Sequence, residues 1–314
     1  MARAGWQDRA RSLGRKLVRV LVAMGALAAV AAAAGAAWEA GQQRAFARAG
    51  FDPPGKLVDI GGRRLHLVCA GRGDPGVMLI GGLGDPYSVW APLQAELARR
   101  TRTCAYDRAG VGWSDPADTP RTAEAAARDL AALLAAARPF DGAPVLVGHS
   151  IGGLYALHYA GTHPGNVTGL VLIDPTTEEL YEAAANWRSD ALYRVLWPVL
   201  GRLGILRLRF RRAHDGLDPD SLDRLAGVAS GHRAARIAAR EYGGLGASFP
   251  APSFAGPLLV LSARGSSRPA LRRSSHARLA EEAADGRMIE IDAGHYIYRD
   301  RPDTVIAVIG SFLD

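Results

Sequence analysis

The sequence predicts an α/β fold in which a mostly parallel sheet is covered by helices on both faces. A chain of 314 residues, 48% of them hydrophobic, is large enough to bury a substantial core, and α/β chains of this length commonly form one domain. From Lys56 onward, short apolar runs of strand type alternate with longer helical patterns. No repeat of fixed period is present, so we expect one folded domain with appendages.

The N-terminus predicts a membrane segment. Residues 1–19 carry six basic side chains, and residues 20–38 then run without a charge, which is long enough to span a bilayer. The positive-inside rule places the basic end in the cytoplasm and the folded domain on the extracytoplasmic side. We expect an uncleaved anchor, with Trp38 as an interfacial aromatic residue. The alternatives are a signal cleaved near Ala34–Ala36 with export of the domain, and a buried helix of a soluble protein.

The charge balance does not point to nucleic acid. The net charge of +7 and the high isoelectric point come largely from the N-terminal basic residues, and no stripe of alternating basic and aromatic residues follows. We therefore expect the membrane to be a partner, and nucleic acid not to be one.

Residues 39–55 are polar and end in Asp52-Pro-Pro-Gly55, which predicts a linker before a domain that spans residues 56–314. The first element is a β-hairpin, because two short alternating runs flank Gly61-Gly62. The further expected strands are 77–80, 103–106, 144–149, 169–173, 257–261 and 288–291. Helical patterns run up to Arg100 and over 123–137, 271–284 and 302–313, and a longer insertion lies between the strands at 169–173 and 257–261.

A nucleophile elbow is predicted at Gly148-His-Ser150-Ile-Gly152. An apolar strand run leads directly into this Gly-x-Ser-x-Gly pattern, and a small-residue helical stretch follows it. The tight turn strains the serine backbone and brings strand and helix close together, so a Cβ atom at Gly148 or Gly152 would clash. Ser150 is therefore the candidate nucleophile, and an ordinary glycine-rich turn is the alternative.

Several motifs in a fixed order make the chain resemble the α/β-hydrolase superfamily. They are Gly-Gly-Leu-Gly at residues 81–84, Tyr-Asp-Arg-Ala-Gly-Val-Gly-Trp-Ser at 106–114, the serine elbow, and Asp-Ala-Gly-His-Tyr at 292–296. The resemblance covers residues 56–314 apart from the insertion. It implies an eight-stranded sheet that begins with strand order one, two, four, three, five, and a helical cap formed by the insertion at about residues 176–254.

A serine nucleophile needs a base that is held in the right tautomer by a carboxylate. His295, just after the last strand, occupies the position where such hydrolases carry the base, whereas His149 is expected to point away from the elbow. The strand at 257–261 is not followed by the usual acid, so Asp174, one strand earlier, is the expected acid. If Asp174 only ends its strand, the rivals are Glu178, Glu179 and Asp292.

The resemblance also implies an oxyanion hole formed by the backbone amides of Leu83 and Ile151. Relatives often carry a histidine where this chain has Gly81, so a side chain that fixes the loop is missing. The turn over residues 107–114 is usually structural in the family, and we expect no chemistry from Asp107.

The two cysteines are too few for a disulfide scaffold and lack zinc-site spacing, so we expect neither metal nor cofactor. The implied strand order makes the strands of Cys69 and Cys104 neighbours. An extracytoplasmic domain then favours a disulfide between them, and two buried thiols are the alternative.

The insertion carries aromatic residues that are candidates for lining an apolar pocket, namely Tyr181, Trp187, Tyr193, Trp197 and Phe210. Core packing is the alternative role for each of them. The basic run from Arg207 to Arg212 is expected to be a solvated helix face, or a contact for anionic lipid head groups.

The expected function is a serine hydrolase that cleaves a small apolar or amphipathic carboxylic ester through an acyl-enzyme. A serine at the elbow argues against dehalogenases and epoxide hydrolases, which need an aspartate nucleophile. Amide or peptide cleavage, thioester cleavage and perhydrolysis use the same residues and stay open. A catalytically inactive ligand sensor or binding protein is the rival from another class.

Overall fold

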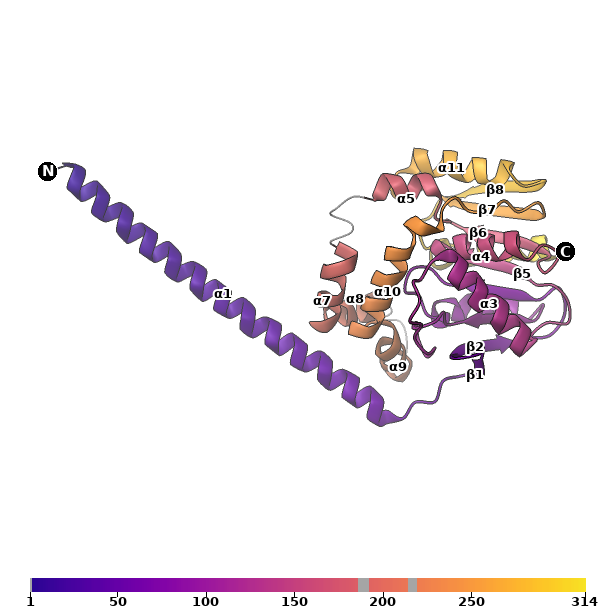
Figure 1. Ribbon diagram of the computed structural model, residues 1–314, viewed down its shortest axis with the longest axis horizontal. Coiled ribbons are helices and arrows are strands. Elements are labelled where there is room, and N and C mark those ends of the chain that lie inside the picture. Colours follow the sequence, from indigo (N-terminus) through magenta and orange to yellow (C-terminus); the bar gives the residue numbers. More distant parts are fainter. Residues whose placement is uncertain (1, 186–191, 214–218) are drawn as a thin grey trace.

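The computed structural model describes residues 2–185, 192–213 and 219–314, and it confirms the predicted α/β-hydrolase fold (Figure 1). Eight strands form one sheet in the order β1-β2-β4-β3-β5-β6-β7-β8. Their bounds are β1 Lys56–Asp59, β2 Arg64–Ala70, β3 Val77–Ile80, β4 Thr103–Tyr106, β5 Val145–His149, β6 Gly169–Ile173, β7 Pro257–Ala263 and β8 Asp285–Ile291. The β1-β2 and β2-β4 pairs are antiparallel, and all other pairs are parallel.

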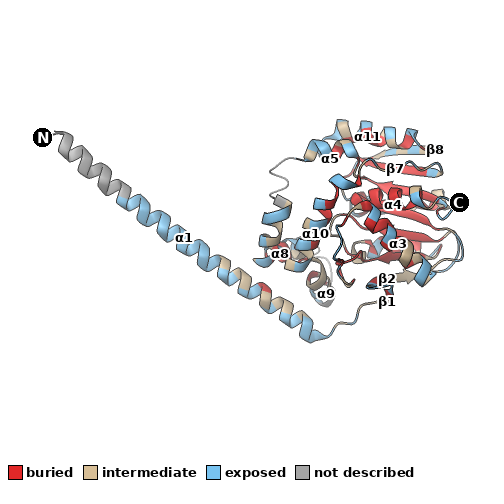
Figure 2. Ribbon diagram, viewed as in Figure 1, coloured by how far each residue is buried: buried red, intermediate tan, exposed pale blue. Residues whose placement is uncertain are grey.

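Alternation along the strands divides the core into two layers. In β3, Met78 and Ile80 join the layer covered by α3 (Ala123–Ala137), α4 (Ile151–Thr162) and α11 (Pro269–Glu281). Val77 and Leu79 join the layer covered by η1 (Tyr87–Trp90), α2 (Ala91–Leu97), α12 (Ile297–Asp300) and α13 (Pro302–Leu313). The central strands β3 to β7 are therefore buried on both faces (Figure 2), as a parallel sheet requires.

The two cysteines lie on neighbouring strands and face one another. Cys69 of β2 is the register partner of Cys104 of β4, and the structure joins them in a disulfide. The bridge links the antiparallel edge of the sheet to its parallel centre.

The N-terminal residues form one helix, α1 (Ala2–Ala49), which extends away from the sheet domain (Figure 1). Its apolar part is long enough to cross a membrane and none of it is buried, features shared by membrane anchors and signal sequences. The helix does not end where a linker is expected at Glu39. It continues to Ala49, because this stretch packs on the protein: Phe46 contacts Trp113 and Phe51.

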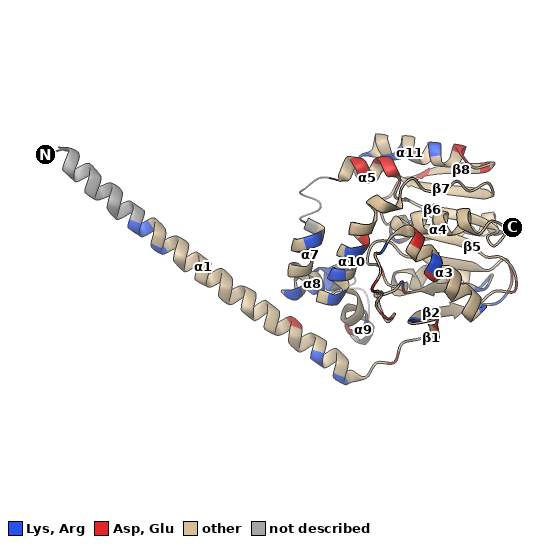
Figure 3. Cartoon of the chain, viewed as in Figure 1, with Lys and Arg blue, Asp and Glu red and all other residues tan. Residues whose placement is uncertain are grey.

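A helical insertion lies between β6 and β7. It comprises α5 (Glu178–Ala184), the π-helix η2 (Leu192–Leu196), α7 (Trp197–Arg202), α8 (Ile205–Ala213), α9 (Pro219–Ala229), α10 (His232–Gly244) and η3 (Gly246–Ser248). Helices α7, α8 and α10 carry many arginines, whereas the exposed apolar part of α1 carries none (Figure 3).

Candidate active site

Ser150 lies at the turn between β5 and α4 in a backbone conformation that non-glycine residues rarely adopt, with φ 54° and ψ −122°. The flanking glycines make this turn possible. A Cβ atom on Gly148 would lie 2.5 Å from the carbonyl oxygen of Gly152, and one on Gly152 would lie 2.3 Å from that of Ile80. This is the close strand-to-helix approach that the Gly-x-Ser-x-Gly pattern predicts.

The structure brings Ser150, His295 and Asp174 into one hydrogen-bonded chain. The Nε2 atom of His295 lies 3.1 Å from the Ser150 hydroxyl, and its Nδ1 atom lies 2.6 Å from Asp174 Oδ2. Asp174 is fully buried, whereas the His295 side chain is 36% exposed. These distances are those of a nucleophile, a base and an orienting acid.

Asp174 follows β6 at the edge of the sheet where the parallel strands end. Its Oδ1 atom accepts a hydrogen bond of 3.0 Å from the amide of Ala263, at the end of β7. Its Oδ2 atom accepts from His295 and also from Arg272 of α11, at 2.9 Å. Burial by itself would raise the pKa of the Asp174 carboxyl, but the hydrogen bond from His295 and the charge of Arg272 outweigh it. The pKa of Asp174 is consequently lowered, and the group is a carboxylate at neutral pH.

The rival carboxylates do not occupy this position. Glu179 forms an ion pair with Arg278, and Asp292 is exposed on the surface. Glu178 lies in the first turn of α5. None of the three has a contact with His295 among the interactions of the described residues, which leaves Asp174 as the acid that the geometry supports.

The candidate oxyanion donors line the same cavity as the serine. Leu83, from the loop after β3, and Ile151, the first residue of α4, both border the cavity at Ser150. The amide of Ile151 begins a helix, where backbone N–H groups point outward and favour negative charge.

Arg108 holds the loop after β3, and sequence analysis did not assign it this role. Its guanidinium donates to the carbonyl oxygens of Gly81 at 2.7 Å and Gly82 at 2.6 Å. It also pairs with Glu241 of α10, and Glu241 accepts from the amide of Gly84 at 2.8 Å. Arg108 and Glu241 thus supply the anchoring that is lost with a glycine at position 81. Both side chains are 1% exposed.

His149 lines the cavity instead of pointing away from it. Its Nε2–H group donates to the carbonyl oxygen of His295 at 3.0 Å, and its Nδ1 atom lies 3.7 Å from Asp85 Oδ2. Burial lowers the pKa of the His149 imidazole, so this ring is neutral at neutral pH. The Asp85 carboxylate also raises the pKa of the nearby Tyr296 phenol. Sequence reasoning missed this group because its members come from the end of β5 and from two separate loops.

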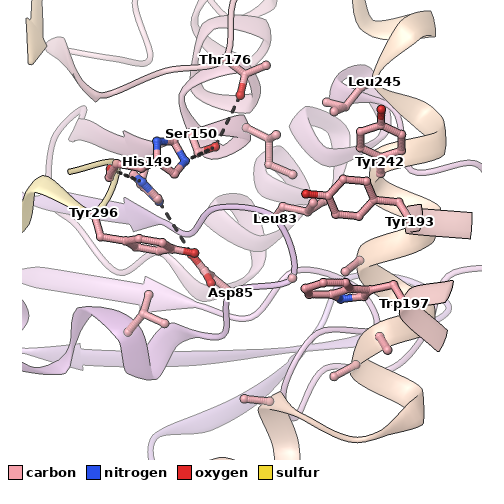
Figure 4. A pocket seen from close by; sticks show the side chains of 18 of the residues that line it. Leu83, Asp85, His149, Ser150, Thr176, Tyr193, Trp197, Tyr242, Leu245 and Tyr296 are labelled. Carbon is pink, nitrogen blue, oxygen red and sulfur yellow. Dashed lines mark hydrogen bonds and ion pairs between the residues drawn. The ribbon is translucent and has the colours of Figure 1, made fainter. Parts of the chain in front are cut away.

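Figure 4 shows the two sides of the cavity, with Ser150, His149 and Tyr296 on one side and Tyr193, Trp197 and Tyr242 on the other. Thr176, whose hydroxyl lies 3.5 Å from that of Ser150, closes one end. The cavity volume is about 570 Å³, which suits a small organic ligand.

Most of the predicted pocket residues face this cavity. The aromatic residues that line it from the insertion include Tyr181, Tyr193, Trp197 and Phe210. Trp187 lies outside the described residues. The basic run is divided in its role: Arg209 lines the cavity, whereas Arg207 is buried in an ion pair with Glu39 of α1 and does not belong to a solvated face.

No cluster of three or more potential metal ligands occurs within residues 2–185, 192–213 and 219–314. The chemistry that the described groups offer is that of a serine hydroxyl, an imidazole and a carboxylate.

Comparison with known proteins places the chain in a family. The sequence model of the Alpha/beta hydrolase family matches residues 77–308, which is most of the chain. The protein therefore belongs to the alpha/beta hydrolase family.

Among curated proteins, the chain is similar to the 2-(acetamidomethylene)succinate hydrolase of Mesorhizobium japonicum, with 28% identity over 278 residues that cover 82% of this chain and 95% of that one. An uncharacterized protein of Schizosaccharomyces pombe is 34% identical over 113 residues, or 36% of this chain. That match spans only 21% of the relative's own length, and several further matches span less than half of the curated relatives.

Solved structures share the fold at low sequence identity. An enol-lactonase from Burkholderia xenovorans LB400 has a TM-score of 0.62 and 22% identity, with 82% of this chain and 99% of that chain covered. A thermophilic esterase from Thermogutta terrifontis, solved with malate bound, has a TM-score of 0.63 and 22% identity, covering 82% and 97%. At this identity the likeness establishes the fold alone.

Proposed function

We propose that the protein is a serine hydrolase that cleaves a carboxylic ester through an acyl-enzyme. The observation that carries this proposal is the chain of contacts from the Ser150 hydroxyl through His295 to the buried Asp174 carboxylate. Such a chain activates a hydroxyl that is otherwise a poor nucleophile at neutral pH.

In this mechanism Ser150 attacks the ester carbonyl while His295 takes the serine proton. The amides of Leu83 and Ile151 donate hydrogen bonds to the oxyanion of the tetrahedral intermediate. His295 then protonates the departing alkoxide, which leaves as the alcohol. Water, deprotonated by the same imidazole, attacks the acyl-enzyme, and the acid is released as Ser150 regains its proton. Asp174 holds the imidazole in its tautomer and stabilises its cationic form throughout.

An amide substrate is the second candidate, because the relative from Mesorhizobium japonicum is named for a substrate that carries an acetamido group. The same residues serve ester and amide cleavage, since only the leaving group differs. Matched p-nitrophenyl ester and p-nitroanilide substrates with one acyl chain separate these candidates by the ratio of their kcat/KM values.

We further propose that α1 is an uncleaved anchor and that the hydrolase domain and its helical cap lie on the extracytoplasmic side. The six basic residues before the apolar run support this orientation. The Cys69–Cys104 disulfide supports it independently, because disulfides persist in oxidising compartments. Retention of the full-length chain in carbonate-washed membranes is the expected result. Release of a chain trimmed near Ala36 would favour export instead.

The decisive test of catalysis uses the full chain in detergent micelles with a fluorophosphonate probe and p-nitrophenyl butyrate. Wild type and the surface control Ser274→Ala are expected to label, and Ser150→Ala is expected not to. Asp174→Asn should lower kcat by about 10⁴-fold, because the imidazole loses the partner that fixes its tautomer. Absence of labelling in wild type would reject the proposed catalytic function and favour a ligand-binding protein. Full activity of Asp174→Asn would reject only the assignment of Asp174 as the orienting acid.

A further inference from the structure

We propose that one face of the helical insertion lies in the surface of the bilayer that α1 spans, and that the enzyme takes amphiphilic esters from that bilayer. The apolar insertion face consists of five exposed side chains on three consecutive helices, η2, α7 and α8, namely Val195, Leu196, Val199, Ile205 and Leu208. This proposal rests on the membrane anchor and the esterase activity proposed above.

The first support is the size and composition of this face. The five side chains are 44–64% exposed, a large apolar area for a protein surface in contact with water. Residues 192–213 also carry six arginines and no aspartate or glutamate. Apolar side chains combined with basic residues are typical of helices that lie at the boundary between lipid head groups and acyl chains.

The second support is the distance along α1. A membrane-spanning helix needs about 20 residues at a rise of about 1.5 Å each. Counted from Val20, the first residue after Arg19, the uncharged run ends at Trp38, about one helical turn beyond Gly35. The turn between α7 and α8 touches α1 at this same level: a Cβ atom on Gly35 would lie 2.7 Å from the carbonyl oxygen of Leu203. Spanning by α1 therefore brings this turn to the edge of the hydrocarbon.

The third support is that the insertion is fixed to α1 and does not merely lie beside it. Trp38 packs against Gly204, and Glu39 forms an ion pair with Arg207 of α8 in which both side chains are 3% exposed. The free part of α1 leaves the molecule on the side where α7 and α8 lie (Figure 1). A bilayer crossed by α1 thus meets these helices before any strand of the sheet.

The same helices form a wall of the active-site cavity. Trp197 of α7 and Leu206, Arg209 and Phe210 of α8 line it, while Ile205 and Leu208 of α8 are exposed outside it. One helix thus presents apolar side chains to the proposed lipid surface and to the substrate. An ester dissolved in the bilayer reaches the cavity along this helix without crossing water.

The first experiment places an environment-sensitive fluorophore on single introduced cysteines, which is practicable because both native cysteines form the disulfide. Leu208→Cys and Val199→Cys are compared with Ile289→Cys, an exposed apolar site on β8, in nanodiscs that hold the full chain. We expect doxyl lipids to quench the two insertion sites and aqueous iodide to quench only the site on β8. Quenching of all three by iodide overturns the proposal. Protection of the insertion sites from both quenchers also overturns it, because protein then covers the face.

The second experiment measures the consequence for substrates. The double variant Ile205→Glu with Leu208→Glu should hydrolyse water-soluble p-nitrophenyl butyrate like wild type but lose about tenfold on a long-chain ester dissolved in the nanodisc, a loss equivalent to about 1.4 kcal/mol. Ile289→Glu should change neither rate. Equal rates of the double variant and wild type on both esters would overturn the delivery route. A wild type inactive on every ester would reject the proposed function while leaving the fluorescence result standing.

Discussion

Arg272 sets the electrostatics of the candidate triad, although it does not contact the serine. It donates to the same Asp174 oxygen that accepts from His295, and its side chain is 10% exposed. The positive charge beside this oxygen contributes to the lowered pKa of the Asp174 carboxyl. Arg272 is therefore a positioning residue that also helps to keep Asp174 ionised.

Replacing Arg272 with methionine should move the acid limb of the kcat/KM profile to higher pH, because the charge of Arg272 helps to keep Asp174 ionised and its loss raises the pKa of this carboxyl. The measurement is the pH–rate profile on p-nitrophenyl butyrate. Arg273→Met, on the same helix but exposed and paired with Glu290, is the matched control. An unmoved limb together with a lower melting temperature would make Arg272 a purely structural residue.

At the residue scale, motif order in the sequence located the three residues that the structure joins in the candidate triad. The sequence did not locate their supports, because each support is a tertiary contact. Arg108 and Glu241 are 133 positions apart, and Arg272 is 98 positions from Asp174. No local pattern marks such pairs. The available signal was an arginine within the motif at residues 106–114, which was regarded as structural.

At the scale of elements, the ion pair between Arg108 and Glu241 connects the insertion to the loop that carries the proposed oxyanion donor. Glu241 belongs to α10, and Arg108 follows β4. Through Arg108 and the amide of Gly84, one carboxylate of the insertion fixes the geometry of the loop after β3. The insertion therefore has two roles, because it covers the cavity and also positions the loop after β3.

Glu241→Gln should lower kcat by about 10- to 100-fold with little change in KM, because a loosened loop weakens a contact made in the transition state. The variant should also melt at lower temperature, since it leaves Arg108 buried and unpaired. Rates are therefore measured well below the melting temperature and expressed per serine titrated with fluorophosphonate. Glu281→Gln, exposed on α11, is the control. A normal kcat per titrated serine would contradict the positioning role.

Most elements were predictable because alternating hydrophobicity and glycine turns mark them locally. The strands at 77–80, 103–106 and 169–173 and the helices at 123–137 and 302–313 have the predicted bounds. The helix over residues 39–49 was not predicted. Its polar residues indicate a linker when considered alone, and only tertiary contacts such as Glu39 with Arg207 explain why it stays helical.

At the scale of the whole molecule, three buried histidines make the fold sensitive to acid. Burial lowers the pKa of His149, His158 and His276. Below the ordinary histidine pKa of about 6.5, the unfolded chain binds protons that the folded protein does not bind. The free energy of unfolding therefore decreases as the pH is lowered. Asp174, whose pKa is also lowered, stabilises the fold while it is ionised. This contribution is lost only at more acidic pH, where the carboxyl becomes protonated.

We expect the free energy of unfolding to fall by about 1–3 kcal/mol per unit as the pH drops from 6.5 towards 5.5. Denaturant titrations of the full chain in micelles at several pH values measure this slope. His276→Gln should reduce the slope, because the variant lacks one of the three buried imidazoles whose pKa is lowered. A stability that is constant or rises over this interval would refute the assignment of buried neutral histidines.

The ion pair between Glu39 and Arg207 marks the boundary between the replaceable apolar part of α1 and the part of α1 that belongs to the folded domain. The apolar part of α1 that is long enough to span a membrane is not buried against the rest of the protein, so another apolar helix of equal length should be able to replace it. Residues 38–46 are part of the folded body, because Trp38, Glu39 and Phe46 fill sites that the insertion and the sheet domain leave open. A soluble form of this protein must therefore begin close to Gly35 and not at the first strand, since a later start leaves Arg207 buried without its counter-charge.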